Sequence, residues 1–518
     1  MNAWDQFSVS AQSARLTVTG ANWINGQWHA GAGIVASESS SGGQHPWEST
    51  SPCQRHVVWR GTAASVEQVD AAVSAARAAW PAWQRSTLEQ RVACVKAYQA
   101  IVQQHSAELA LLIARETGKT LWEGKSEAAT VAGKVDLSIS ALQTRRDTQG
   151  ELTGSERVIT RFKSHGVLAV LGPFNFPAHL PNGHIVPAIL AGNTVVFKPS
   201  ELTPAVGQWM AAAWEKAGLP PGVINLVQGG RETGAALIQH PQIDGLLFTG
   251  SSSAGKFFHQ QFAAQPQKIL ALEMGGNNPL VVSKVADLDA TVYQILLSAY
   301  ITSGQRCTCA RRLILVEDEN TSDLLERVSR RAATLSVGWF DQQPEPFMGS
   351  LISPQAGRQV FEFWQQLQAA GGTSLLTPRA VDNQTALVTP GLIEMTHARD
   401  VPDEECFGPV LQVYRVASLT DAIALANRTK YGLSAGLLTQ QLSDWDEFIA
   451  TIRAGVVNLN RQTTGASGKL AFGGCGLSGN HRPSGYYAAD YCSFPVASME
   501  SDVLTVPESK MPGMNWDS

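Results

Sequence analysis

The sequence predicts a multidomain α/β protein built around a parallel β-sheet. Its 518 residues exceed what one hydrophobic core usually organises, and a chain of this length divides into about two to four domains. Between residues 166 and 275, short apolar runs alternate with amphipathic segments, which is the pattern of parallel strands joined by helical crossovers. Polar and glycine-rich motifs follow several of these runs, at the sheet edge where ligands bind in such folds.

The composition argues against two classes of partner. Hydrophobic residues make up 44% and charged residues 16% of the chain, as in an ordinary globular enzyme. No apolar run approaches the roughly 18 residues of a membrane span. The formal charge of -5 and the lack of a long basic stretch argue against a nucleic-acid surface. We therefore expect small molecules and further copies of the chain as partners, and neither nucleic acid nor membrane.

The amino terminus and the cysteines predict a cytoplasmic protein without a metal. The first sixteen residues lack the basic region and apolar core of a secretory signal. An odd number of scattered cysteines suits free thiols in a reducing compartment. These are Cys53, Cys94, Cys307, Cys309, Cys406, Cys475 and Cys492. A single C-x-C pair without further Cys or His ligands is a weak metal motif, so we expect no bound metal.

Two elements are predicted before the sheet. Residues 36–55 are rich in Ser, Gly and Pro and predict a surface loop. Residues 65–80 and 86–116 carry apolar positions at helical spacing, and the pattern from Ser86 to Glu89 is that of a capping box. We expect two packed helices here.

Five strands and the helices between them are predicted next. The strands cover residues 166–172, 193–198, 222–229, 245–250 and 268–275, with helices that include residues 185–192 and 203–217. Asn175 follows the first strand, and Lys198 and Glu201 follow the second. Because carboxyl ends of parallel strands share one edge, these side chains are expected to gather there.

A nucleotide needs a phosphate site, yet this region has no G-x-G-x-x-G fingerprint. The best substitute is the small-residue turn Gly250-Ser251-Ser252-Ser253-Ala254-Gly255, where free amides at a helix start can face a phosphate. The same turn could be a plain N-capped helix after a strand.

Cys307 and Glu273 are the candidate catalytic pair. Cys307 lies in the polar, glycine-flanked turn Gly304-Gln305-Arg306-Cys307-Thr308, and Glu273 ends the fifth predicted strand. A thioester mechanism requires a thiolate nucleophile and a carboxylate that deprotonates water. Taken alone, an isolated Cys is usually a buried hydrophobe and a Glu at a strand end is usually solvated.

The motifs GPFNFP, NTVVFKPSELTP, LFTGSSSAG, LEMGGNNP, SGQRCTCARR, EECFGP, VNLN and FGG occur in this order. Together they resemble the aldehyde dehydrogenase superfamily, from about residue 57 to the carboxyl end. FPAHLPNGHIVPA, LEMGGNNPLVV, SGQRCTCARRL and SGNHRPSGYYAADYC resemble the branch that oxidises N-succinylglutamate 5-semialdehyde in the succinyl-dependent degradation of arginine.

The resemblance implies an aldehyde dehydrogenase-like fold in three parts. Residues 1–142 and 164–275 would form a Rossmann-like NAD-binding domain, and residues 276–484 an α/β catalytic domain. Residues 143–163 and 485–518 would form a small β oligomerisation arm and tail. Exposed strand edges need partners, so a homodimer or homotetramer is expected.

The resemblance also implies the catalytic roles. Cys307 matches the nucleophile that attacks the aldehyde carbon, which gives a thiohemiacetal. Asn175 matches the amide that donates to its oxygen together with the Cys307 backbone N–H. Glu273 matches the base that activates water to hydrolyse the thioester.

For the cofactor, Lys198 and Glu201 match the residues that reach the adenosine ribose. A carboxylate there accepts from the 2'-hydroxyl and repels a 2'-phosphate, so NAD is expected rather than NADP. Glu405 and Phe407 match the residues beside the nicotinamide ribose and ring. Where many relatives carry Trp or Tyr, this chain has Phe174, so a polar contact from that side chain is absent.

The substrate carries two carboxylates that need cations or amides in a closed pocket. Arg461 is the first candidate, ahead of a group that could equally be solvated or structural: Arg306, His179, His184, His481 and Arg482. The first 22 or so residues and residues 36–50 receive no role.

The sequence offers two alternatives from other functional classes and one from the same fold. Gly432-Leu433-Ser434-Ala435-Gly436 fits the G-x-S-x-G motif of serine hydrolases, but only His481 follows it in the sequence. A non-catalytic binding protein would be expected to lose Cys307 or Glu273. A dehydrogenase of another acidic semialdehyde remains the alternative within the same fold.

Overall fold

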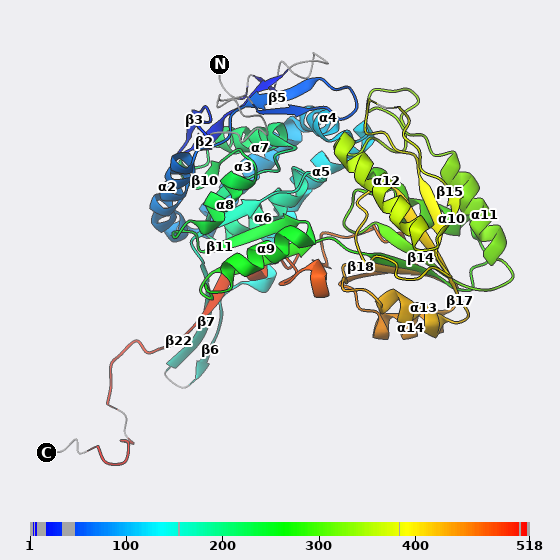
Figure 1. Cartoon of the computed structure of the whole chain (residues 1–518). Helices are drawn as coiled ribbons and strands as arrows, with labels where there is room; N and C mark the ends of the chain where they lie inside the picture. The colour runs from blue at the N-terminus through cyan, green and yellow to red at the C-terminus, as the bar shows by residue number, and fades with distance from the viewer. Residues whose placement is uncertain are drawn as a thin grey trace.

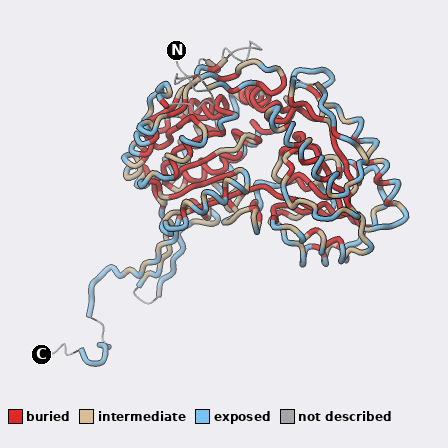
Figure 2. Tube along the Cα trace, in the orientation of Figure 1, coloured by how far each residue is buried: buried red, intermediate tan, exposed pale blue. Residues whose placement is uncertain are grey.

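The computed structural model describes Trp4 and residues 6–7, 17–33, 47–153, 156–382, 384–506 and 509–514. Two lobes, each with a seven-stranded sheet, lie side by side, and a narrow β arm projects from the first lobe (Figure 1). Buried residues fill the interior of both lobes, whereas the arm and tail are mostly exposed (Figure 2). The α/β fold class predicted from the sequence is confirmed.

The first lobe contains the predicted parallel strands in the order β12-β11-β8-β9-β10. Their bounds are β8 Val167–Leu171, β9 Thr194–Lys198, β10 Ile224–Leu226, β11 Gly245–Gly250 and β12 Ile269–Met274. Two antiparallel strands, β2 (Asn22–Ile24) and β3 (Gln27–His29), extend the sheet beyond β10.

Helices cover both faces of this sheet, because its strands are apolar on both sides. Alternate residues of β8 illustrate this, since Leu168 and Val170 join one core while Val167, Ala169 and Leu171 join the other. The first core is completed by α3 (Leu88–Gln104), α5 (Leu121–Arg145), α6 (His179–Leu190) and α7 (Pro204–Lys216). The second is completed by α2 (Val66–Arg85), α8 (Arg231–Gln239) and α9 (Ser252–Phe262).

The amino-terminal elements differ from prediction in three details. The segment predicted as one helix over 86–116 is two, α3 and α4 (Ser106–Thr117), which meet at His105. The capping box is formed by Thr87 with Gln90 rather than by Ser86 with Glu89, and the Ser86 hydroxyl instead closes α2 by donating to Trp83 O. Part of the predicted loop 36–55 is strand β4 (Trp47–Thr50), which pairs with β5 (Val57–Gly61).

Strand β5 also pairs with β1 (Val18–Thr19), which completes a three-stranded sheet. Residues 51–55 of the predicted loop form the turn between β4 and β5, and residues 36–46 lie outside the described residues.

The second lobe has the strand order β15-β16-β17-β14-β13-β18-β19, parallel except for the edge strand β15. The strands are β13 Asn278–Val282, β14 Ala310–Val316, β15 Thr373–Leu376, β16 Gly391–Glu394, β17 Val410–Val416, β18 Ser434–Leu438 and β19 Val456–Leu459. Its helices are α10 Leu288–Tyr300, α11 Thr321–Ala333, α12 Pro354–Ala369, α13 Leu419–Asn427 and α14 Leu442–Thr451. Helices α10 and α11 pack on one face, and α13 and α14 on the other.

The arm is an antiparallel sheet of β6 (Gln149–Thr153), β7 (Glu156–Ser164) and β22 (Ser493–Glu500), in the order β22-β7-β6. Strand β7 is central, so its two neighbours present open edges. Residues 143–145, which the sequence assigned to the arm, are the last turn of α5. Among the described residues, no helix is long and apolar enough to cross a membrane.

Candidate active site

The candidate site lies where the carboxyl edge of the first sheet faces the amino edge of the second. Glu273 is the penultimate residue of β12, and only three residues separate that strand from β13. Cys307 lies three residues before β14, and Glu405 lies five residues before β17. The two sheets therefore contribute different catalytic candidates to one place.

The loop that carries Cys307 has an unusual backbone. Thr302, Ser303 and Gly304 all have positive φ angles, of 56°, 54° and 74°. Two consecutive non-glycine residues in this region are strained and persist only where their surroundings hold them. Ser303 Oγ donates to Gly349 O at 2.7 Å, and Gln305 Nε2 donates to Ser350 O at 3.2 Å. The loop is thus fixed to the segment that precedes α12.

Arg311 ties this loop to a second one. Its buried guanidinium donates to Gly304 O at 2.7 Å and Arg306 O at 3.0 Å, and lies 3.4 Å from Glu405 Oε1. It therefore holds the Cys307 loop and the Glu405 loop together. The sequence did not single out this residue, although it is the third residue of CARR within the motif SGQRCTCARR.

Cys307 sits on a fixed backbone with a neutral thiol. Asn278 Nδ2 donates to Cys307 O at 2.7 Å and to Cys309 O at 2.9 Å. Burial, and then the nearby carboxylates Glu273 and Glu405, raise the pKa of the Cys307 thiol well above its usual value. The thiol therefore needs a base before it can react.

Glu273 can supply that base. It is fully buried, and neither carboxylate oxygen accepts a hydrogen bond from a described residue. Burial and then the charge of Glu405 raise the pKa of Glu273 to about 8. The neighbouring Cys307 thiol lowers this pKa slightly, although it does not form a hydrogen bond with the carboxylate. Its position depends on Gly479, which pairs with Glu273 across a bridge of antiparallel backbone.

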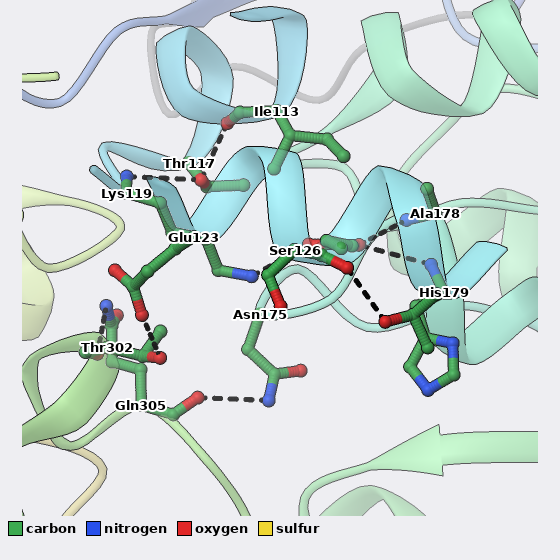
Figure 3. A network of polar contacts seen from close by, with 12 residues as sticks. Ile113, Thr117, Lys119, Glu123, Ser126, Asn175, Ala178, His179, Thr302 and Gln305 are labelled. Carbon is green, nitrogen blue, oxygen red and sulfur yellow. Dashed lines mark hydrogen bonds and ion pairs between the residues drawn. The ribbon is translucent and has the colours of Figure 1, made fainter. Parts of the chain in front are cut away.

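Asn175 joins the first lobe to the Cys307 loop. Its Nδ2 donates to Gln305 O at 3.0 Å, which uses one of its two N–H bonds (Figure 3). The backbone N–H of Cys307 has no acceptor among the described residues. Both unused donors belong to the region expected to hold the aldehyde oxygen.

The cofactor candidates at the end of β9 form a compact group. Lys198 is buried and donates to Gly229 O at 2.7 Å and Pro199 O at 2.9 Å. Its Nζ lies 3.8 Å from Glu201 Oε2, and that carboxylate is half exposed. A fixed ammonium beside an accessible carboxylate suits a ribose with two hydroxyls.

The predicted phosphate turn is the start of α9. Ser251 is its N-cap, and Ser251 Oγ accepts from the Ala254 N–H at 3.3 Å. The first turn leaves other N–H groups without helical partners, at the positive end of the helix. Both the plain cap and the free amides are thus present.

Glu405 and Phe407 lie at the junction of the lobes. The Glu405 carboxylate packs so closely on Gly275 that a Cβ there would lie 1.6 Å from Oε2, so only glycine fits. Phe407 meets Phe174 edge to face, with ring centroids 5.8 Å apart. Burial raises the pKa of Glu405, and Arg311 partly offsets this. Together with Lys198 and Glu201, these residues fit a dinucleotide laid across the edge of the first sheet.

The predicted substrate residues separate into two groups. Arg306 Nε donates to Thr302 Oγ1 at 2.7 Å, its guanidinium lies 3.6 Å from Glu123, and it stacks on Phe176 at 5.2 Å. His179 meets the same ring edge to face at 6.2 Å. Arg306 directly precedes Cys307 in the chain, and His179 follows Asn175 by four residues. Both side chains contact the ring of Phe176.

The other candidates lie elsewhere or are already occupied. His184 is buried between Tyr491 Oη and Thr249 Oγ1, and Arg482 donates to Gly474 O. Arg461, at the turn after β19, and His481 are exposed. Their part in substrate binding stays a prediction.

A charged network at the amino-terminal end of α5 was not anticipated from the sequence. Lys119 pairs with Glu127 at 2.8 Å, and Glu127 Oε1 accepts from the N–H groups of Ala178 and His179. Glu123 accepts from Thr302 Oγ1, which fastens the Cys307 loop to α5 (Figure 3). Lys119 precedes the helix, and Glu123 and Glu127 lie four residues apart on one face of α5, so the spacing of the two carboxylates was the available signal.

Comparison with known proteins agrees with this geometry. Residues 38–494 match the aldehyde dehydrogenase family. The chain belongs to the aldehyde dehydrogenase family. Such enzymes act on aldehydes with a nicotinamide cofactor, and the sequence-based resemblance to this family is confirmed.

Individual relatives show how far the likeness extends. The chain is 49% identical to the N-succinylglutamate 5-semialdehyde dehydrogenase of Escherichia coli O9:H4 over 95% of this chain and 98% of that protein. A solved NAD-dependent aldehyde dehydrogenase from Sinorhizobium meliloti has a TM-score of 0.87 at 26% identity, covering 96% and 97% of the two chains. An NADP-dependent enzyme of Escherichia coli has a TM-score of 0.85 at 27% identity, covering 93% and 98%. The solved relatives of this aldehyde dehydrogenase thus include users of either cofactor.

Proposed function

We propose that this aldehyde dehydrogenase oxidises N-succinylglutamate 5-semialdehyde to N-succinylglutamate in arginine degradation, with NAD as its cofactor. The observation that carries the chemistry is a half-buried thiol beside a buried carboxylate without a hydrogen-bond partner among the described residues, with Asn175 hydrogen-bonded to the same loop. The support for the substrate is the near full-length likeness to relatives that carry this name.

Cys307 is the proposed nucleophile. Glu273, when ionised, accepts the thiol proton, and the thiolate forms a carbon–sulfur bond to the aldehyde carbon. The carbonyl oxygen becomes an oxyanion in the thiohemiacetal. Asn175 Nδ2 and the Cys307 backbone N–H donate to that oxygen, a contribution typically of about 3 to 4 kcal/mol per donor.

Oxidation and release follow at the same residues. Lys198, Glu201, Glu405 and Phe407 would hold the nicotinamide cofactor, which would supply the hydride acceptor for the thiohemiacetal carbon. Glu273 passes the thiol proton to solvent and then removes a proton from water, which attacks the thioester carbon, and the sulfur leaves as the thiolate. The acid is released and Cys307 recovers a proton.

The preference for NAD rests on Glu201. A carboxylate near the adenosine ribose accepts from a 2'-hydroxyl and repels a 2'-phosphate. The nearby Lys198 is buried and already bonded to two carbonyl oxygens, so it is poorly placed to neutralise an extra phosphate.

The assembly and its location complete the proposal. We assign cofactor binding to the first lobe, the nucleophile to the second, and oligomerisation as a homodimer or homotetramer to the arm. The open edges of β6 and β22 support an arm that pairs with another subunit. All seven cysteines are free, which supports a reducing compartment such as the cytoplasm.

A panel of substrates tests the proposal. Initial rates of NADH or NADPH formation are measured with N-succinylglutamate 5-semialdehyde, glutamate 5-semialdehyde and succinate semialdehyde, each with NAD and with NADP. The succinylated aldehyde with NAD should give the highest kcat/KM. A clear preference for another acidic semialdehyde would support that alternative, and no NADH with any aldehyde would contradict catalysis altogether.

A further inference from the structure

One face of α6 runs from the catalytic asparagine toward the interior of the first lobe. His179 and Gly183 are one helical turn apart, so they lie on the same face, about 6 Å apart along the axis. A Cβ added to Gly183 would lie 3.7 Å from Lys134 Cε and 3.8 Å from Ser484 Oγ. The end of the Lys134 side chain therefore rests on α6, one turn beyond His179.

Lys134 is a buried cation without a counter-ion. It is 3% exposed, and its Nζ donates to Gly485 O at 2.9 Å. No carboxylate of the described residues lies within ion-pair distance of it, and its remaining N–H bonds have no acceptor there. A buried ammonium in this state is costly, and desolvation lowers its pKa to about 8.

The neighbouring carboxylates do not neutralise the charge of Lys134, because they are paired with other cations. Lys119 is neutralised by Glu127 at 2.8 Å, and Arg306 lies 3.6 Å from Glu123. Two cations and two carboxylates thus balance each other around Phe176. Lys134 remains as one uncompensated positive charge on the α6 face.

His179 adds an unused polar atom to the same face. Its Nδ1 is buried and has no hydrogen-bond partner among the described residues. Its side chain extends to the same side of the network as that of Asn175 (Figure 3). The face therefore offers two polar groups with unused hydrogen-bonding capacity, first His179 and then, one helical turn further on, Lys134.

We propose that Lys134 and His179 form the subsite that binds a carboxylate of the substrate, remote from the aldehyde group. The inference rests on the proposed function, because an aldehyde with carboxylates further along its chain is the ligand this face fits. The carboxylate accepts from Lys134 Nζ and from the His179 ring. The substrate carboxylate supplies the negative charge that Lys134 lacks. Arg306 and Lys119 do not bind it, because each is already paired with a carboxylate of the protein.

Kinetics of Lys134→Met test this assignment, because methionine keeps the length of the side chain and removes its charge. The variant and the unaltered enzyme are compared with N-succinylglutamate 5-semialdehyde and with pentanal, a neutral aldehyde. For the succinylated aldehyde we expect KM to rise about 10- to 100-fold, with little change in kcat. For pentanal, KM should stay the same or fall.

Lys125→Met is the matched control, since Lys125 is exposed on the same helix. It should leave both aldehydes unaffected. Equal changes of Lys134→Met on the two aldehydes, or no change on either, would overturn the subsite. Failure of the proposed function would look different, because the unaltered enzyme would then have a low kcat/KM for the succinylated aldehyde.

If Lys134→Met does not fold, a structure of the unaltered enzyme with bound N-succinylglutamate tests the assignment of the subsite to Lys134 and His179. A product carboxylate within hydrogen-bonding distance of Lys134 Nζ or His179 Nδ1 supports the assignment. A bound product whose carboxylates contact neither residue refutes it.

Discussion

Burial changes the pKa values of the two proposed catalytic side chains, Cys307 and Glu273. Cys307 and Glu273 both lie in an environment that disfavours their charged forms, so at neutral pH the pair is mainly a neutral thiol beside a carboxylic acid. Reaction begins only when Glu273 is ionised. The pair is coupled, and the base controls when the nucleophile becomes available.

The first expectation concerns the sulfur itself. Cys307→Ser should lower kcat by at least about 1,000-fold, because a hydroxyl is a far weaker nucleophile and its proton is harder to remove. Measurement of NADH formation with the purified variant checks this. Cys309→Ala, which changes a buried thiol two residues away, should retain most of the activity. A fully active Cys307→Ser enzyme would exclude a thioester route.

The second expectation concerns pH. Because Glu273 must be ionised and its pKa is raised to about 8, kcat should increase about tenfold per pH unit below pH 8 and level off above it. Folding has the opposite dependence. A carboxyl group with a raised native pKa stabilises the fold least once pH has risen through that pKa.

Glu273→Gln should therefore abolish the pH-dependent rate and raise the melting temperature more at pH 8 than at pH 5. Thermal unfolding of both proteins at the two pH values measures the difference. An equal change at both pH values would contradict a raised pKa.

Among the secondary-structure elements, β12 shows how a strand end is held in place for catalysis. Asn480 Oδ1 accepts from Leu272 N at 2.7 Å, and Ser478 Oγ donates to Gly275 O at 2.7 Å. Between them, Gly479 has φ of 136° and approaches the strand so closely that a Cβ would lie 2.2 Å from Leu272 O. The segment 478–480 therefore clamps the strand end that carries Glu273.

Gly479→Ala should consequently displace β12 and reduce both stability, by about 2 kcal/mol or more, and kcat. Denaturant unfolding and initial rates check the two effects. Gly133→Ala on α5 is the control, because an added Cβ there meets no atom within 4 Å. Helix propensity then favours alanine by about 1 kcal/mol. Normal kinetics in Gly479→Ala would show that the clamp has no role.

The elements also show what the sequence could predict. The strands of the first sheet were predictable because β-branched runs such as Thr194–Lys198 are buried on both faces. The capping box was misplaced by one residue because Ser86 to Glu89 and Thr87 to Gln90 both fit the same pattern. Strand β4 was missed because Trp47–Thr50 is a polar edge strand without alternating apolar residues.

The site was predictable only in part, for a similar reason. Cys307, Glu273 and Asn175 stand in recognisable motifs, and their proposed roles follow from these. The burial of Lys134 and Arg311 depends on which distant segments pack over them. The neighbouring sequence does not predict which segments these are. Both residues became noticeable only through their surroundings in the fold.

The molecule as a whole has an arm with open edges and exposed apolar side chains. Leu152 is 72% exposed and Met499 is 73% exposed, on the two outer strands β6 and β22. Exposed apolar edges are unusual in a monomer and favour pairing with another chain. The arm projects away from both lobes, so pairing there leaves the site free (Figure 1).

The double variant Leu152→Lys, Met499→Lys should therefore dissociate the oligomer into smaller species. Light scattering after size-exclusion chromatography measures the mass. Leu442→Lys replaces an equally exposed leucine on α14 and should leave the mass unchanged. An oligomer of unaltered mass in the double variant would place the interface elsewhere.

The division of the catalytic pair between two sheets has a mechanical result. The base is anchored to one lobe and the nucleophile to the other, and the chain crosses between them in three residues. The separation of carboxylate and sulfur is therefore a measure of how the lobes are tilted. Any change that rocks one lobe against the other, however distant from the site, will be felt as a change in reaction rate.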